Sequence, residues 1–428
     1  AYEIDGRDWS SDVCFSDLDA QLKDTGDREI STTMAFVRIL NTLCRDKTIG
    51  KRVVPIVPDE SRTFGMEGMF RQLGIYSPKG QLYKPEDADQ LMFYKESKDG
   101  QVLQEGINEA GGMADWIAAS TSYSTHDAQM VPFYIYYSMF GFQRVGDLAW
   151  AAGDMRARGF LLGGTAGRTT LNGEGLQHED GHSHILAQTI PNCVSYDPTF
   201  SYELAVIVQD GLRRMLDEQE DVYYYITLMN ENYHHPAMPE GAEEDIKKGL
   251  YRFRAAEKKS RGKQARVRLM GSGTIFREVI AAADLLKQDW GVEAELFSAP
   301  SFNELARDGQ QVTRWNMLHP TEKPRKTHVA AILGDDDTPV IATTDYMRLF
   351  AEQIRGYVPA PYVVLGTDGY GRSDYRKVLR SFFEVDRHYV TVAALSALAE
   401  AGSIPRGKVK EAIDKYGIDT DKPYPLYS

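Results

Sequence analysis

The chain alternates short strand-like segments with longer segments of helical period, and few folds accommodate such a pattern. The strand-like segments lie at residues 51–57, 159–163, 192–196 and 222–229, and again at 267–270, 292–297, 328–333, 340–343 and 362–365. Helices are predicted between them, at residues 31–44, 105–120, 133–153, 199–219 and 275–287. Strands that alternate with helices of this length predict mostly parallel sheets covered by helices, the α/β class.

The alternation occurs in two series, separated by the turn-rich residues 234–242 (HHPAMPEGA). A chain of 428 residues is also longer than one ordinary domain of about 150 residues. We therefore predict two consecutive α/β domains, over residues 26–240 and 241–428. Residues 2–18 show neither period, and we predict that residues 1–25 form a non-native or disordered leader.

Composition excludes several classes of protein. The formal charge of −13 disfavours a nucleic-acid partner. The three cysteines have no short spacing, which argues against a disulfide framework and a cysteine zinc site. No apolar run approaches the roughly 20 residues of a membrane helix, and the first residues do not resemble a signal peptide, so we expect a cytoplasmic protein. The basic residues 258–268 are predicted to form a solvated loop.

The densest polar cluster lies in residues 163–184 (GGTAGRTTLNGEGLQHEDGHSH), which contain Glu174, His178, His182 and His184. The letters HEDGH match the H-E-x-x-H pattern of zinc peptidases, but that pattern requires a helix. The glycines disfavour a helix here and indicate a loop that approaches a ligand closely. A loop whose histidines only stabilise it is the alternative, and no metal site is expected.

Three shorter motifs each allow two interpretations. Glu105 and Glu109 begin a predicted helix, where carboxylates are also favoured by the helix dipole alone. Residues 132–144 (PFYIYYSMFGFQR) contain six aromatic residues, which form either core or a stacking surface for a flat ligand. The Gly271-Ser272-Gly273 turn could bind an anion, but it lacks a third glycine, and a tight strand-to-helix turn explains it.

Taken in order, these motifs resemble the homodimeric pyruvate dehydrogenase E1 component of bacteria. The resemblance covers about residues 26–428. It rests on the runs STTMAFVRIL, DESRTFGMEGMFRQLGIYSP, LQEGINEAG, TTLNGEGLQHEDGHSH, MNENYHHPAMPEGAEE, SFNELARDGQ, RWNMLHP and LGTDGYGRSDYR.

The resemblance implies a transketolase-like subunit with a diphosphate-binding, a pyrimidine-binding and a C-terminal domain, of which this chain matches the last two. It implies thiamine diphosphate as cofactor, with Mg²⁺ held by the first domain. The implied activity is pyruvate decarboxylation with transfer of acetyl to the lipoyl domain of a dihydrolipoyl acetyltransferase, in a homodimer. Alternatives are another thiamine enzyme, such as transketolase or 2-oxoglutarate dehydrogenase, or a non-catalytic dimerisation or scaffold chain.

The resemblance also assigns roles to cofactor-binding residues. Glu109, in a Gly-Ile-x-Glu motif with Ile107, is the acid that holds a proton at N1′ of the cofactor and so favours its imino tautomer. A carboxyl buried against an apolar ring suits such proton sharing. Phe140 would stack on the aminopyrimidine, and Tyr137 would line the same pocket.

The substrate side is assigned in the same way. Glu174 and His178 match polar positions beside the reaction centre, where His178 would hold the substrate and the intermediate. His182 and His184 are further substrate-binding candidates. Asp59 and Glu60 follow a predicted strand end, where α/β folds bind ligands, and are assigned to the cofactor pocket. Residues 79–95 are predicted to form a mobile loop over the site.

Overall fold

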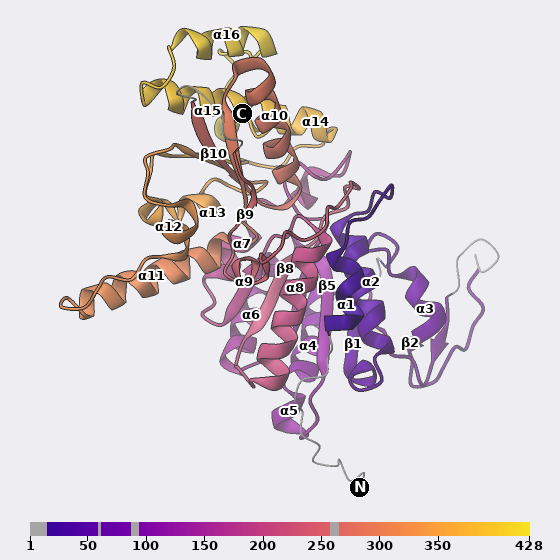
Figure 1. The fold of residues 1–428 in the computed structure, drawn as a ribbon. Helices are drawn as coiled ribbons and strands as arrows, with labels where there is room; N and C mark the ends of the chain where they lie inside the picture. Colours follow the sequence, from indigo (N-terminus) through magenta and orange to yellow (C-terminus); the bar gives the residue numbers. More distant parts are fainter. Residues whose placement is uncertain (1–14, 59–60, 87–93, 257–264) are drawn as a thin grey trace.

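A computed structural model describes residues 15–58, 61–86, 94–256 and 265–428 of the chain, with the side chains of residues 15–17 left out. It contains two large sheets, one in each lobe of the molecule (Figure 1). Every strand pair of the first sheet is parallel, and one antiparallel strand edges the second. The predicted α/β class with mostly parallel sheets is therefore confirmed.

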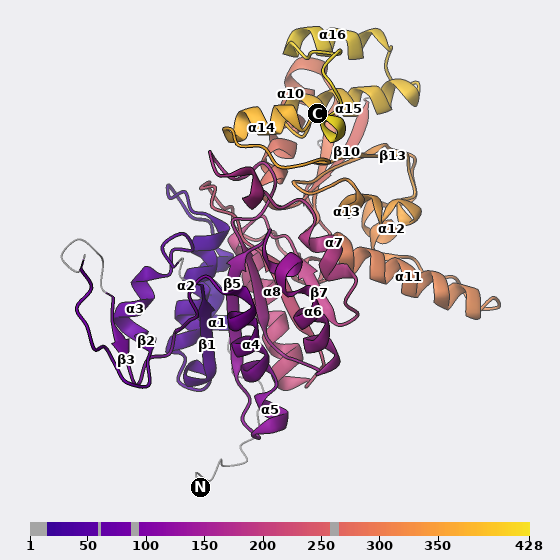
Figure 2. The same ribbon diagram turned by 180° about the vertical axis from the view of Figure 1, so that it is seen from behind.

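The first sheet has six strands in the order β4-β1-β5-β6-β8-β7. Their bounds are β4 Leu103–Gln104, β1 Val53–Val57, β5 Val131–Tyr137, β6 Phe160–Gly164, β8 Tyr223–Thr227 and β7 Cys193–Tyr196. The helices around it are α2 (Thr32–Arg45), α4 (Glu109–Ser120), α6 (Gly141–Asp154), α7 (Ser183–Gln188) and α8 (Ser201–Leu212). Helices α2 and α8 cover one face, and Figure 2 shows α4 and α6 over the other.

Strand β5 explains how one segment supports both faces of this sheet. Phe133 and Ile135 belong to the core under α2 and α8, whereas Tyr134 and Tyr136 belong to the core under α4 and α6. Successive side chains of a strand point to opposite faces, so all four are buried. The strand is thereby fixed in the middle of the sheet.

The second sheet has the order β13-β12-β10-β11-β9. Its strands are β13 Tyr362–Leu365, β12 Val340–Thr343, β10 Arg266–Gly271, β11 Glu293–Ser298 and the antiparallel β9 Tyr251–Arg254, which was not predicted. Helices α10 (Phe276–Trp290) and α15 (Arg387–Glu400) pack on one face. Helices α11 (Phe302–Leu318), α12 (His328–Leu333) and α13 (Leu349–Glu352) pack on the other, and α11 projects from the body in Figures 1 and 2.

The remaining elements are short or peripheral. They are α1 Phe15–Leu22, α3 Glu67–Leu73, α5 Ser122–Thr125, α9 Glu243–Lys247, α14 Arg376–Phe382, α16 Gly407–Tyr416 and the small parallel pair β2 Ile75–Tyr76 and β3 Glu96–Ser97. Helix α16 packs against α15. In the part of the chain that is described, none of the helices is long and apolar enough to cross a membrane.

Two predicted elements are of the wrong type. The helix predicted at residues 133–153 begins only at Gly141, because the aromatic residues before it form β5. The strand predicted at residues 328–333 is helix α12 instead. The Thr327 side chain caps that helix by accepting from the Ala330 N–H, and Val329 and Leu333 share its buried face. Short apolar runs do not distinguish the two structures by period alone.

The structure also differs from the predictions for the leader, residues 1–25, and for the basic residues 258–268. Helix α1 lies within the predicted leader and packs against α2 and α8 with Leu18 buried, so this part of the leader is ordered in the structure. Of the basic residues 258–268, the first seven lie outside the described residues. Both Arg266 and Arg268 belong to β10, so the loop prediction is wrong for them. Arg266 is exposed as expected, whereas Arg268 is buried and paired with Asp336 at 2.8 Å.

Candidate active site

The first sheet gathers aromatic and polar side chains at the carboxyl ends of its two central strands. Strand β5 ends at Tyr137, and β6 is followed by residues 165–182, here called the polar loop. Carboxyl ends of adjacent parallel strands meet at one sheet edge, so these segments lie together. The His178 ring lies 5.1 Å from the Tyr137 ring and 5.0 Å from the Phe140 ring, measured between centroids.

Glu109 joins this aromatic group through Arg144. Glu109 opens helix α4, whose N-terminus is capped by the Asn108 side chain accepting from the Gly111 N–H at 3.1 Å. Its Oε1 accepts from Arg144 Nη1 at 2.6 Å, and the Arg144 guanidinium lies 4.1 Å from the centre of the Phe140 ring. Glu109, Phe140, Tyr137 and His178 thus form one contiguous group, here called the half-site.

The half-site offers two kinds of contact to a ligand. The Phe140 ring provides a face for stacking, and the Glu109 carboxylate accepts a hydrogen bond from a nitrogen donor. The planar, cationic Arg144 guanidinium already makes both contacts. A flat heteroaromatic ring with a protonated nitrogen has the shape and donor chemistry to replace it.

The polar loop presents only some of its acids and histidines. Glu174 is exposed, and His178 is half-buried at the end of the short 3₁₀ turn Leu176–His178. The Nδ1 atom of His178 is buried and has no hydrogen-bond partner among the described residues. His178 is therefore able to donate to or accept from a ligand beside the aromatic rings.

The other two histidines of the predicted polar cluster, His182 and His184, lie apart from the aromatic rings of the half-site. His182 is half-buried and precedes helix α7. His184 is fully buried, where its ring stacks on Phe350 at 4.7 Å and its Nε2 lies 3.0 Å from the Thr227 hydroxyl. Burial lowers the pKa of His184 to about 3, so its ring is neutral. The structure thus separates His184 from the half-site and places it in the core between the two sheets.

The helix that the H-E-x-x-H interpretation requires does not form. The 3₁₀ turn ends at His178, and Glu179 has an extended backbone, so His178 and His182 do not share one helical face. Among the residues described, no group of three or more His, Cys, Asp or Glu side chains is arranged to hold a metal ion.

The remaining predicted site residues and the predicted loop lie partly outside the described residues. Asp59 and Glu60 lie outside the described residues. The Ile107 side chain is 74% exposed, just before the helix cap at Asn108. Of the predicted loop at residues 79–95, the stretch 87–93 also lies outside the described part.

Sequence reasoning missed two residues that organise this region. Arg144 lies one helical turn after Phe140, a spacing that could have identified it as a partner of that ring. Asp345 follows strand β12 as a buried acid, and it accepts hydrogen bonds from Thr169 and Thr170 of the polar loop. Those contacts join residues 175 or more positions apart, which no local pattern reveals.

Comparisons with known proteins identify the family of the chain. The family model described as "Pyruvate dehydrogenase E1 component middle domain" matches residues 11–236, and "Transketolase-like TK C-terminal domain" matches residues 249–386. The chain is 71% identical over 412 residues to the pyruvate dehydrogenase E1 component of Cupriavidus necator, and 62% identical over 400 residues to that of Escherichia coli K12. These matches cover 96% and 93% of this chain but 46% and 44% of the relatives, so the chain spans less than half their length.

Solved structures with the same fold are more distant in sequence. A transketolase from Leishmania mexicana superposes with a TM-score of 0.63 at 16% identity, over 92% of this chain and 50% of that one. A split-gene transketolase described as an inactive beta4 tetramer gives a TM-score of 0.54 at 16% identity, over 86% of this chain and 98% of that one. The structural likeness shows the fold, while the family model and the relatives show that this chain belongs to the pyruvate dehydrogenase E1 component family.

Proposed function

We propose that this chain supplies the pyrimidine-binding half of a thiamine-diphosphate site in an intact E1 enzyme that decarboxylates pyruvate. The observation that carries the proposal is the half-site itself. A carboxylate, two aromatic rings and a histidine whose Nδ1 has no partner among the described residues meet at the carboxyl edge of a parallel sheet. This is where α/β folds bind their ligands.

The residues fit the aminopyrimidine of the cofactor. The Arg144 guanidinium lies on Phe140 and pairs with Glu109, which are the contacts that a flat, protonated heterocycle needs. When bound, thiamine diphosphate supplies a thiazolium carbon that becomes a nucleophile after losing its proton. Glu109 would hold a proton at N1′, and Phe140 and Tyr137 would stack on and orient the ring.

The substrate side of the site would be formed by the polar loop. His178 lies against both rings and would donate to the carboxylate or the developing oxyanion of a 2-oxo acid. Glu174, exposed on the same loop, would border this space, with His182 further along the loop.

The wider assignments belong to the same proposal. Residues 26–240 would form the pyrimidine-binding domain and residues 241–428 the C-terminal domain. Mg²⁺ would be held by a diphosphate-binding domain outside this chain, and the intact enzyme would be a cytoplasmic homodimer. It would transfer acetyl to the lipoyl domain of a dihydrolipoyl acetyltransferase.

A non-catalytic role in assembly is the second candidate. The split-gene transketolase described as an inactive tetramer has nearly the same extent as this chain, which covers 98% of it. Calorimetric titration of the isolated chain with thiamine diphosphate and Mg²⁺ bears on both candidates. The half-site proposal predicts no tight binding, and submicromolar affinity would contradict it because most diphosphate contacts are expected elsewhere.

The reaction is tested in a full-length E1 chain that carries these residues. Release of CO₂ from pyruvate and from 2-oxoglutarate would be measured with ferricyanide as electron acceptor. We expect pyruvate to be strongly preferred. Preference for 2-oxoglutarate, or no decarboxylation by a folded, cofactor-loaded enzyme, would contradict the proposal.

A further inference from the structure

The polar loop is anchored at its start to the second sheet. The backbone N–H of Arg168 donates to the Asp345 carbonyl at 3.0 Å. Thr169 donates to Asp345 Oδ1 through its N–H at 2.9 Å and its hydroxyl at 2.6 Å, and the Thr170 hydroxyl donates to Oδ2 at 2.6 Å. Asp345 lies just past the end of β12 and is fully buried.

A second attachment comes from residues 366–376, here called the latch, which follow β13 and end at the start of α14. The Gly173 N–H donates to the Asp374 carbonyl at 3.1 Å, and the Arg372 N–H donates to Glu179 Oε2 at 2.6 Å. Gly173 and Glu179 lie on either side of Glu174 and His178 in the chain. The latch therefore holds both flanks of the loop segment that carries these two site residues.

The latch backbone also packs closely against the turn that carries His178. A Cβ atom at Gly371 would lie 2.3 Å from the Leu176 carbonyl oxygen and 2.9 Å from Glu179 Cβ. Leu176 begins the 3₁₀ turn that ends at His178. Only glycine permits so close an approach, so any larger residue at position 371 must displace the turn or the latch.

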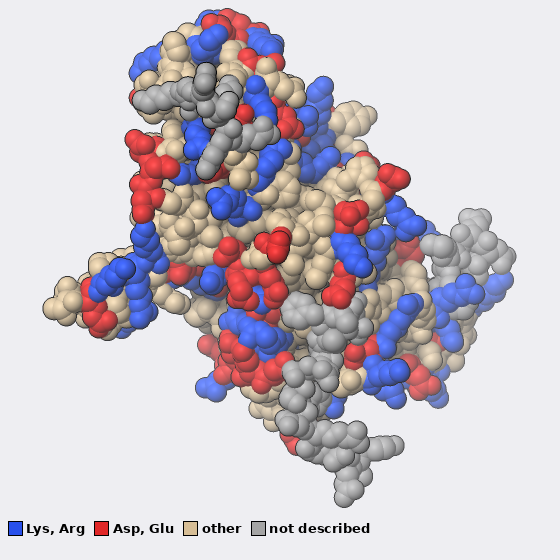
Figure 3. All heavy atoms as spheres, viewed as in Figure 1, with Lys and Arg blue, Asp and Glu red and all other residues tan. Residues whose placement is uncertain are grey.

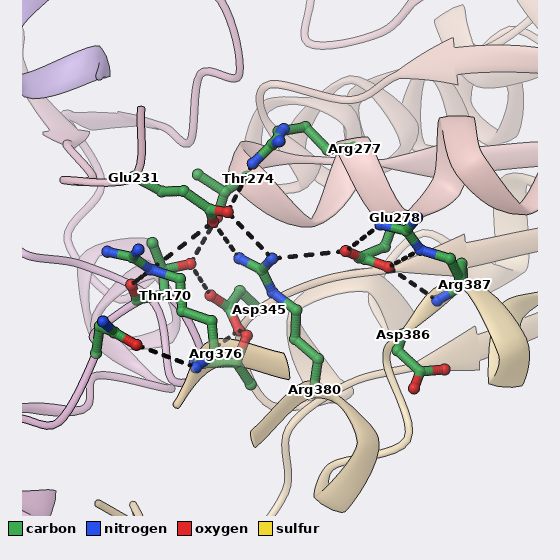
Figure 4. Close-up of polar contacts among 12 residues, drawn as sticks. Thr170, Glu231, Thr274, Arg277, Glu278, Asp345, Arg376, Arg380, Asp386 and Arg387 are labelled. Atoms are coloured by element: carbon green, nitrogen blue, oxygen red, sulfur yellow. Dashed lines mark hydrogen bonds and ion pairs between the residues drawn. The ribbon is translucent and has the colours of Figure 1, made fainter. Parts of the chain in front are cut away.

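Charged residues hold helix α14, which follows the latch, against the first lobe and against α10. Figure 4 shows Arg376 and Arg380 near Glu231, which follows β8 of the first sheet. Arg380 pairs with Glu231 and also lies 3.5 Å from Glu278 of α10. Although burial acts to raise it, Arg380 and Arg277 hold the pKa of Glu231 below its usual value. The network is thus ionised, and it ties α14 to the first sheet and to α10.

Two buried ionisable groups under the latch have unused hydrogen-bonding capacity. Glu179 is 1% exposed, and its Oε1 has no partner among the described residues. Nε and Nη1 of Arg168, which is 5% exposed, are likewise without partners in the described part of the chain. Burial raises the pKa of Glu179 to about 8, against the lowering effect of the Arg372 N–H; Asp345 raises it further and Arg168 lowers it.

We propose that the latch positions His178 and Glu174 for the reaction, so that the second sheet contributes to the active site. The positioning residues are Gly371 in the latch and Glu179 in the polar loop. The inference rests on the proposed function for what His178 does, but the contacts that hold the loop belong to this chain alone. The latch fixes the loop mechanically and contacts no reacting atom.

Amide hydrogen exchange on the 428-residue chain tests the latch without cofactor or substrate. Gly371→Ala should speed exchange in peptides from residues 169–178 by about tenfold or more, while peptides from β10 stay at the wild-type rate. Gly407→Ala is the matched control, because a Cβ at that glycine meets no atom within 4 Å. Wild-type exchange at residues 169–178 in folded Gly371→Ala would overturn the proposal.

Glu179 variants keep the test decisive if Gly371→Ala exchanges rapidly throughout and so fails to fold. Glu179→Ala removes the acceptor of the Arg372 N–H and should speed loop exchange locally, whereas Glu179→Gln keeps an acceptor oxygen and should restore near wild-type exchange. Equal exchange in all three proteins would overturn the proposal. Because no turnover is measured, this outcome is separate from the pyruvate test of the proposed function.

Discussion

The carboxyl edges of the parallel strands differ between the two sheets in how their side chains are buried and paired. At the edge of the first sheet, Tyr137, Phe140 and His178 are only partly buried and pack against one another. At the edge of the second sheet, Ser272 and Asp345 are fully buried. The Ser272 hydroxyl donates to Asp197 of the first sheet at 2.7 Å, and Asp345 binds the polar loop.

The first edge therefore carries a candidate binding site, whereas the second edge connects the two lobes. The contacts of Ser272 and Asp345 with the first lobe are here called the joint. The polar groups of the second edge are satisfied by loops of the first lobe, so little hydrogen-bonding capacity remains there for a ligand. Burial raises the pKa of Asp197 to about 7, despite hydrogen bonds from Ser272 and Thr227. Over the face drawn in Figure 3, acidic and basic side chains are interspersed on both lobes.

The largest effect is expected on the free energy of unfolding, when the joint loses Asp345. Asp345→Ala leaves a buried N–H and two buried hydroxyls without their acceptor. We expect a loss of about 3–5 kcal/mol in the free energy of unfolding. Urea unfolding of the chain measures it, and a loss below about 1 kcal/mol would show that the joint does not depend on this residue.

The next effect is the pH dependence of the free energy of unfolding that arises from Glu179 in the polar loop. Glu179 has a folded pKa of about 8 against an ordinary value of 4.5, so between these values the folded state binds a proton that the unfolded state lacks. Its contribution is present below about pH 4.5 and is lost as the pH rises towards 8. Wild type should therefore lose on the order of 2–4 kcal/mol more than Glu179→Gln between pH 5 and 9. Parallel pH profiles of the two proteins would contradict this.

A smaller effect is expected in the half-site, where ligand affinity should change more than stability. Phe140→Ala in a full-length E1 chain removes the stacking face and should weaken thiamine-diphosphate binding by about 2- to 10-fold. Calorimetric titration gives the dissociation constant, and Phe140→Tyr serves as the control because it keeps the ring. Unchanged affinity in the alanine variant would remove Phe140 from the cofactor pocket.

The smallest effect is expected at the exposed tip of the polar loop. Glu174 is exposed, so Glu174→Ala should change the free energy of unfolding by less than about 0.5 kcal/mol. Urea unfolding beside Asp345→Ala provides the comparison. A loss above about 1 kcal/mol would mean that the loop tip belongs to the joint.

The sequence was sufficient to predict strand β6, which precedes the polar loop, and helix α4, which carries Glu109, because apolar runs and their boundaries are local features. The aromatic segment before Gly141 was misread as a helix because strand β5 is buried on both faces and shows no polar alternation. The spacing of Arg144 from Phe140 could have indicated their contact, but the ion pair of Arg144 with Glu109 and the hydrogen bonds of Asp345 with Thr169 join distant segments and were not predictable from local patterns. His184 was grouped with the site by proximity in sequence, although the start of α7 carries it into the core.

The most direct test of the half-site compares two carboxylates four residues apart. Glu109 pairs with Arg144, whose guanidinium lies on the Phe140 ring. Glu105 instead forms a hydrogen bond with Asp115, and burial together with this bond raises the pKa of Asp115 to about 6. The turnover of pyruvate by full-length E1 would be measured with Glu109→Gln and with Glu105→Gln. We predict a loss of about 100-fold or more for Glu109→Gln and of less than about threefold for Glu105→Gln. Wild-type turnover in Glu109→Gln would contradict the assignment of Glu109 as the acid that activates the cofactor.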